Sequence, residues 1–130
     1  MKVLCKYNNP DNPPKNTTSD FNYGLELEKE YLVMGMILCE NQLWYLIDEG
    51  NPNFYPKGLF DITDSRLSQR WYFKTYSEDE EMYPYVQAIW GYYELVSDEV
   101  HYEQLVGKER EVLELYFKRK REIEKKLISY

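Results

Sequence analysis

Short apolar runs separated by turn residues dominate the first 76 positions of the chain. Several runs alternate apolar with polar positions, which is the pattern of half-buried strands, and turn signals recur about every eight to twelve residues. The expected strands are residues 2–7, 30–39, 42–47, 59–62 and 70–76. Strands this short at this spacing are typical of a small antiparallel barrel or a rolled sheet, and we expect a five-stranded antiparallel β-barrel over residues 2–76.

The strongest strand signal is the run Glu30–Cys39, EYLVMGMILC, which is apolar on both alternating faces. Such a run predicts a central strand that is covered on both sides. Gly35 in its middle is where a barrel strand can bend sharply, and Glu40-Asn41 is the expected tight turn of the hairpin that follows. The Pro-rich segment 8–20 is an expected loop.

Two positions near the ends of these runs carry more specific expectations. Trp71 and Phe73 share one face of the last expected strand, so we expect both side chains in the barrel core. Pro56 follows an extended pair of aromatic residues, and it should place that piece at a sheet edge, because proline cannot donate to a ladder.

The pattern changes after Tyr76. Residues 77–81, SEDEE, predict an exposed acidic turn or the start of a short helix, and residues 86–96 fit either a strand or a helix. Ser97 followed by two acids is an N-cap signal for a short helix over residues 98–106. Residues 108–128 predict one long helix, because they are rich in Glu, Leu, Lys and Arg and carry an apolar stripe. That stripe comprises Val112, Leu113, Tyr116, Phe117, Ile123 and Leu127.

These elements predict an α+β fold, a small antiparallel barrel followed by C-terminal helices. The 130 residues suit one domain, and 43% apolar residues are enough for a core without a disulfide or metal. We expect a barrel part at 2–76, an acidic connecting segment at 77–97 and a helical part at 98–130. The first half of the long helix should pack on the barrel, and its second half should project.

Cysteine usage and the apolar runs favour an intracellular protein. Cys5 and Cys39 are in no metal-ligand or redox spacing, which favours two reduced, partly buried thiols over a disulfide or a reactive thiol. No run approaches the about 18 apolar residues that span a bilayer, and the first residues lack the apolar stretch of a signal peptide. We therefore expect a cytoplasmic protein with no membrane partner.

Charge is unevenly distributed along the chain. Residues 1–74 carry eight basic and ten acidic side chains, residues 75–107 eight acidic and no basic ones, and residues 108–130 eight basic and five acidic ones. The resulting net charges of −2, −8 and +3 sum to the −7 of the whole chain. An acidic protein repels phosphates, so nucleic acid is a poor candidate partner.

Templates for catalysis find little support. Six scattered glycines make no phosphate loop, and two distant cysteines with one histidine make no zinc site. His101, the lone histidine, is best interpreted as structural. A carboxylate pair for glycoside chemistry stays open, because acids are abundant. We expect a protein without enzymatic activity, catalytic residues, cofactor or metal.

Acidic and aromatic residues cluster in one stretch of the acidic middle. Four consecutive acids repel one another unless they are solvated or face a basic partner, and aromatic anchors are typical of protein interfaces. The candidate partner-binding residues are therefore Glu78, Asp79, Glu80, Glu81, Tyr83, Tyr85, Trp90 and Tyr93. A solvated loop is the alternative reading of the acidic run.

Two other charged stretches are secondary candidates. Asp48 and Glu49, beside the aromatic pair Trp44-Tyr45, form a possible second binding patch on the barrel. The basic run at 118–121 fits RNA, an acidic partner, or a solvated helix end with favourable dipole placement. Tyrosine, with 14 copies, suits both protein-binding surfaces and β-rich cores.

Five segments carry a resemblance to a known family. They are EYLVMGM at 30–36, LWYLID at 43–48, YPKGLFDI at 55–62, RLS at 66–68, and the aromatic residues Trp71 and Phe73. In these segments the chain resembles small bacterial immunity proteins of polymorphic toxin systems, including contact-dependent growth inhibition. The resemblance covers about residues 2–75 and implies an SH3-like barrel followed by helices. The family's binding residues vary, so none is carried over.

Two functions remain in competition. The resemblance implies an immunity protein that binds a cognate toxin, a basic protein and in many cases a nuclease, and silences it by covering its active or substrate-binding surface. An SH3-like adaptor or regulatory module that recognises a cellular protein is the alternative. An immunity gene lies directly after its toxin gene, so gene neighbourhood separates the two. The sequence leaves the oligomeric state open.

Overall fold

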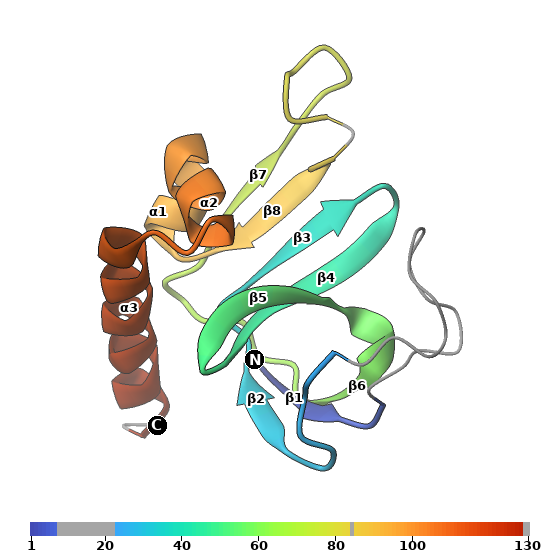
Figure 1. Ribbon diagram of the computed structural model, residues 1–130, viewed down its shortest axis with the longest axis vertical. Coiled ribbons are helices and arrows are strands. Elements are labelled where there is room, and N and C mark those ends of the chain that lie inside the picture. Colours follow the sequence, from blue (N-terminus) through green and yellow to red (C-terminus); the bar gives the residue numbers. More distant parts are fainter. Residues whose placement is uncertain (8–22, 84, 129–130) are drawn as a thin grey trace.

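The protein is an α+β fold in three layers (Figure 1). The computed structural model describes residues 1–7, 23–83 and 85–128, with side chains up to residue 125. A three-stranded sheet packs on one face of a five-stranded sheet, and three C-terminal helices cover the other face. All strand pairs are antiparallel, and both sheets are open. The expected loop at 8–20 lies outside the described residues.

The two sheets mix strands that are far apart in the sequence. The small sheet has the order β2-β1-β6, with strands β2 (Glu30–Leu32), β1 (Lys2–Cys5) and β6 (Phe60–Asp64). The large sheet has the order β5-β4-β3-β8-β7, with strands β5 (Asn51–Pro56), β4 (Gln42–Glu49), β3 (Gly35–Cys39), β8 (Ala88–Gly91) and β7 (Tyr72–Thr75). A single 3₁₀ turn, η1 (Lys57–Leu59), precedes β6.

The expected five-stranded closed barrel over residues 2–76 is wrong. Strand β8, from the segment 77–97 that we expected to be a connection, pairs with β3 on one side and β7 on the other. The first 76 residues therefore do not form a complete sheet system by themselves. Pro56 does lie on an edge strand, β5, as expected.

The long run Glu30–Cys39 is two strands rather than one. Val33 and Met34 carry the chain from the small sheet to the large one, and Gly35 then opens β3. Val33 is buried between the two sheets, whereas Met34 is buried against the helices. A run that is apolar on both faces is thus explained by two cores. The turn at Glu40-Asn41 is confirmed, with positive φ at both residues (48° and 67°), as short hairpins require.

The sheet–sheet core fills the space between the two sheets. Its buried residues are Met1, Val3, Cys5, Leu25, Tyr31, Val33, Met36, Tyr45, Ile47, Tyr55 and Leu59. Both cysteines are free, as expected, with Cys5 buried and Cys39 half-buried. Burial raises the pKa of both thiols, so neither has the thiolate character of a reactive cysteine.

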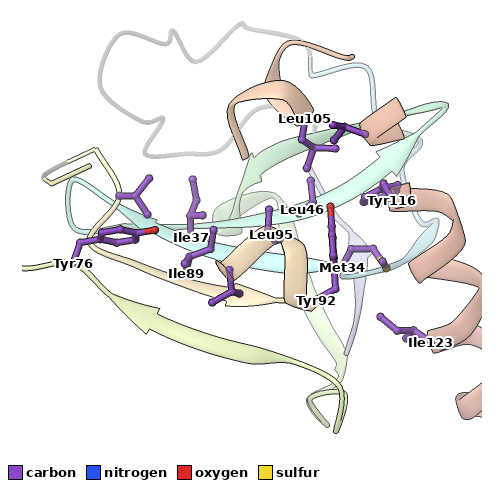
Figure 2. Close-up of a cluster of buried hydrophobic side chains, with 13 residues drawn as sticks. Met34, Ile37, Leu46, Tyr76, Ile89, Tyr92, Leu95, Leu105, Tyr116 and Ile123 are labelled. Carbon is purple, nitrogen blue, oxygen red and sulfur yellow. The ribbon is translucent and has the colours of Figure 1, made fainter. Parts of the chain in front are cut away.

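The helix-side core lies between the large sheet and the helices (Figure 2). Its buried residues are Met34, Ile37, Leu46, Tyr76, Val86, Ile89, Tyr92, Leu95, Val96, Leu105, Val112, Tyr116 and Ile123. Tyr92 and Tyr116 are the largest fully buried side chains, and their rings meet edge to face at 6.1 Å. Ile123 is buried in this core too, so the second half of the long helix packs against the rest of the protein rather than projecting.

Three helices follow β8 directly. They are α1 (Tyr93–Ser97), α2 (Glu99–Val106) and α3 (Arg110–Ile128). The ambiguous stretch 86–96 thus holds both a strand and a helix, and helix begins before residue 98. The N-cap of α2 is Asp98, whose carboxylate accepts the Val100 N–H at 3.0 Å; Ser97 ends α1 instead. Asp98 directly precedes the first residue of α2, where its carboxylate can accept that N–H and its charge suits the helix N-terminus.

Gly35 and Gly91 lie directly opposite each other in β3 and β8, under the side chain of Leu95. A Cβ on Gly35 would lie 2.8 Å from the Trp90 carbonyl oxygen and 2.5 Å from Leu95 Cδ2. We expect Gly35→Ala to lower the free energy of unfolding by about 1–3 kcal/mol, because backbone atoms cannot give way. Gly107→Ala, where a Cβ meets nothing closer than 3.5 Å, is the control. Urea denaturation measures both, and equal midpoints would contradict the prediction.

His101 is buried on α2, with its Nε2 atom 2.7 Å from the Tyr92 hydroxyl. Burial lowers the pKa of the imidazole below its ordinary 6.5, although Glu94 and Asp98 oppose the shift. Between the pKa of His101 in the folded protein and its pKa in the unfolded chain, the unfolded chain binds a proton that the folded protein does not. The free energy of unfolding therefore decreases as the pH is lowered.

We therefore expect a loss of stability from about pH 7 to about pH 5 that is smaller in His101→Gln. Thermal melts across this range measure the difference. Glu94 does not confuse the result, because its partner Arg119 lowers the pKa of its carboxyl and moves its contribution to more acidic pH. Parallel pH profiles for the two proteins would contradict the assignment.

Candidate protein-binding face

Strand β7 forms one edge of the large sheet and is exposed along its whole length. Its sequence, YFKT, combines aromatic and β-branched residues that favour strands. Among the described residues it pairs with β8 on one side only. Figure 1 shows the β7–β8 hairpin extending beyond the rest of the sheet, with its connecting loop at the far end.

Aromatic pairs flank this edge on both faces. Tyr72 meets Tyr93 edge to face at 5.2 Å, and Phe73 lies over Trp90 at 5.0 Å. Tyr72, Phe73 and Tyr93 are each more than half exposed, at 53%, 56% and 55%. Trp90 is half-buried against the sheet–sheet core. Three of the four rings are therefore largely solvent-facing, and the two pairs lie on opposite faces of the edge.

Phe73 is not in the core, contrary to expectation. The sheet–sheet core is built on β3, β4 and β5 from the large sheet, and Phe73 on β7 lies beyond its margin. Trp71, just before β7, is half-buried and packs against both cores. Alternation along the strand correctly separated the residues of its two faces. It could not show that the small sheet, which covers one of these faces elsewhere, does not extend as far as Phe73.

The acidic turn, Glu78–Glu81, lies between β7 and β8, and all four side chains are exposed. Ser77 holds the turn: its hydroxyl donates to Asp79 Oδ1 at 2.6 Å, and its N–H donates to Glu80 Oε1 at 3.2 Å. The first of these bonds lowers the pKa of the Asp79 carboxyl. Within the described part of the chain, Glu78 and Glu81 have neither a hydrogen bond nor an ion pair, so their charges are free to act on a partner.

The other predicted aromatic residues of this stretch separate. Tyr85, just past the acidic turn, is 68% exposed and belongs with it at the tip of the hairpin. Tyr83 is half-buried against the helix-side core and is a structural residue. Tyr72 and Phe73 are the aromatic residues of this edge that are absent from the candidates drawn from the sequence, because their contacts with Tyr93 and Trp90 depend on the pairing of β7 with β8.

We call the exposed rings together with the acidic turn the β7 edge face. Its members are Tyr72, Phe73, Trp90, Tyr93, Tyr85 and the turn Glu78–Glu81. The rings of β7 lie at the start of the strand, and the acids follow its end. An apolar surface with an adjacent concentration of negative charge is suited to binding a protein that carries basic residues.

Asp48 and Glu49 lie elsewhere and are committed to contacts within the protein. Asp48 is 11% exposed and accepts hydrogen bonds from Lys120 Nζ at 2.7 Å and the Tyr116 hydroxyl at 3.1 Å. Glu49 accepts from the Tyr31 hydroxyl and pairs with Lys29 Nζ at 3.2 Å. The structure does not bring these two acids together with the acidic turn, and they are not part of the β7 edge face.

The basic run at 118–121 is also partly used inside the protein. Arg119 makes a two-pronged contact with Glu94, at 2.7 and 3.0 Å, and a second one with Glu122. The pair with Glu94 holds α3 against α1, and it lowers the pKa of the Glu94 carboxyl. The pairing of Arg119 with Glu122 at i,i+3 is the part that the sequence could have shown.

Other kinds of site find no structural support in the described residues. Among them, no group of three or more His, Cys, Asp and Glu side chains could hold a metal ion. No helix in the same part of the chain has the length and apolar character needed to cross a membrane. Comparisons of the chain with protein-family models, with curated proteins and with solved structures found no match.

Proposed function

We propose that this protein is an immunity protein that binds a cognate bacterial toxin through the β7 edge face and neutralises it by covering its active or substrate-binding surface. One observation carries the proposal: exposed aromatic pairs at the start of an open edge strand are followed, at the tip of the same hairpin, by four exposed acids. The resemblance of residues 2–75 to SH3-like immunity proteins supports it. We include in the proposal that these strands derive from an SH3-like barrel. The site of action is the cytoplasm, where a toxin's targets lie.

The chemistry of the face fits such a partner. Exposed aromatic side chains supply short-range binding energy once they are buried, and Trp and Tyr are the commonest hot-spot residues. The acids of the turn attract a basic surface and speed the encounter. A nuclease needs a basic surface to hold phosphates, so an acidic inhibitor can bind to that same surface.

Co-expression with the product of the gene directly upstream tests the proposal. We expect the wild-type protein to restore growth of cells that make this toxin and to co-purify with it. The double substitution Phe73→Ser and Tyr93→Ser should weaken binding by about tenfold or more, because it removes two aromatic anchors.

The matched control substitutes two exposed apolar residues outside the face, Ile62→Ser and Leu67→Ser. Both are about as exposed as Phe73 and Tyr93, at 52% and 50%. We expect this variant to protect cells and to bind the toxin as the wild type does. Absence of binding by the wild-type protein would refute the function, and equal binding by the two double variants would refute the face.

A further inference from the structure

The backbone of β7 offers hydrogen-bonding groups at an open edge. Strands β7 and β8 pair in the register Tyr72↔Gly91, Phe73↔Trp90, Lys74↔Ile89 and Thr75↔Ala88. Just beyond the strand, the Tyr76 N–H donates to the Gln87 carbonyl at 2.9 Å. Hydrogen-bonded and non-hydrogen-bonded pairs alternate in an antiparallel ladder, so this bond fixes the phase.

It follows that Tyr72 and Lys74 direct their backbone groups to β8, whereas Phe73 and Thr75 direct theirs away from it. The N–H and C=O groups of Phe73 and Thr75 thus point outward along the edge. β7 has no second neighbour in the sheet, and none of these four groups bonds to another backbone group of the described chain. They form the donor and acceptor pattern that an added strand would use.

The opposite edge of the large sheet is protected against such pairing. Strand β5 carries Pro52 and Pro56, which lack the N–H donors that an added strand would need. Strand β7 has no proline, and its one charged residue, Lys74, is held by Glu99 at 4.0 Å and lies over the Tyr76 ring. The β7 edge is therefore the open one of the two.

We propose that β7 takes up an extended segment of the partner protein as a sixth strand of the large sheet, with basic residues of that segment facing the acidic turn. This inference rests on the proposed function and specifies how the partner docks. Side chains of an added strand alternate between the two faces of the sheet. On one face they meet Phe73 and Trp90, and on the other Tyr72 and Tyr93.

Charge selects the occupant. The segment that follows β7 holds four acids, and residues 75–107 carry eight acidic and no basic side chains. An extended segment with Lys or Arg at the end that reaches Glu78 and Glu81 gains attraction there, because neither acid has an ion-pair partner among the described residues. An acidic or uncharged segment gains nothing from the turn.

Thr75→Pro is the decisive variant, because proline removes one outward donor and fills its place with a ring. The N–H that is lost points away from β8, so the β7–β8 ladder keeps its bonds and the variant folds. Thr75→Val is the matched control, since it changes the side chain and keeps the N–H. We expect the proline variant to weaken toxin binding by about tenfold or more and the valine variant to leave it within about twofold.

Amide hydrogen exchange by NMR supplies the second readout. In the free protein, Phe73 and Thr75 amides should exchange fast and those of Tyr72 and Lys74 slowly; in the complex all four should be slow. Strand addition is overturned if the toxin binds the proline variant as tightly as the wild type and does not protect the Phe73 and Thr75 amides of the wild-type protein. That result leaves the proposed function standing. Protection of both amides in the free protein, lost on dilution, makes a second copy of the chain the occupant and also overturns it.

A synthetic peptide of alternating Val and Lys residues tests the edge without any toxin. Its binding, with protection of the Phe73 and Thr75 amides and with loss of binding in Thr75→Pro, supports the inference even if the upstream gene product does not bind. If neither that product nor the peptide protects these amides, the inference is overturned. An alternating Val and Glu peptide, which the acidic turn should repel, is the control for charge.

Discussion

Lys120→Met is expected to lower the free energy of unfolding by about 2–3 kcal/mol, because it leaves the carboxylate of Asp48 without its cation in a largely buried position. Lys120 Nζ lies 2.7 Å from Asp48 Oδ2, and the two side chains are only 24% and 11% exposed. The Tyr116 hydroxyl donates to the same oxygen at 3.1 Å. One neutral donor cannot replace the lost charge. Methionine keeps the length of the side chain, so packing changes little.

Lys118→Met is the matched control on the same helix. It makes the same chemical change two residues away, at an exposed position with no ion pair to a described residue. We expect it to change stability by less than about 0.5 kcal/mol. Adding Asp48→Asn to Lys120→Met should recover part of the loss, because it removes the uncompensated charge. Equal urea midpoints for the two methionine variants would show that the pair contributes nothing.

This ion pair could not be predicted from the sequence. Asp48 and Lys120 are 72 positions apart, and each belongs to a local pattern that has a simpler reading. Asp48 lies beside an aromatic pair in the sequence, which favours a binding patch. Lys120 lies in a basic run that suits a helix C-terminus. Their contact depends on how α3 packs against the large sheet. In the structure this packing buries Tyr116 and Ile123.

Local signals predicted local structure well. The long helix is confirmed as α3, and the hairpin turn at Glu40-Asn41 is confirmed in place. The strand pairing was wrong because pairing is non-local. The prediction of a closed barrel was wrong because it left out β8. The pattern of these four residues fits a strand or a helix, and in the structure they form the strand between β3 and β7. Burial in the middle of a sheet outweighs weak local preference.

The candidate site was predicted in part for the same reason. Four consecutive acids identify an exposed turn in any fold, and Glu78–Glu81 is such a turn. Phe73 was misassigned because a period of two shows which residues share a face but not whether that face is covered. Near the margin of a sheet, a residue can share a face with core residues and still be uncovered. An aromatic residue in that position is available for binding.

Reversal of the acidic turn should slow association with the toxin by about tenfold or more at low salt and leave folding almost unchanged. Replacing Glu78, Asp79, Glu80 and Glu81 by Lys together makes the largest charge change. Two of these acids also hold the turn through Ser77, so that variant changes geometry as well as charge. Glu78→Lys with Glu81→Lys is the sharper test, because neither side chain bonds to a described residue.

The control is Asp61→Lys with Glu111→Lys, which makes the same charge change at exposed positions on β6 and α3 without breaking an ion pair to a described residue. Both double variants alter the net charge equally, so a difference between them reports local steering. Stopped-flow association at low and high salt measures it, since salt screens beyond about 10 Å at 0.1 M. Trp90→Ala should act mainly on dissociation, because a buried anchor is felt after encounter. Equal slowing by both double variants would mean that the overall charge attracts the toxin and that the acidic turn has no special place in the interface.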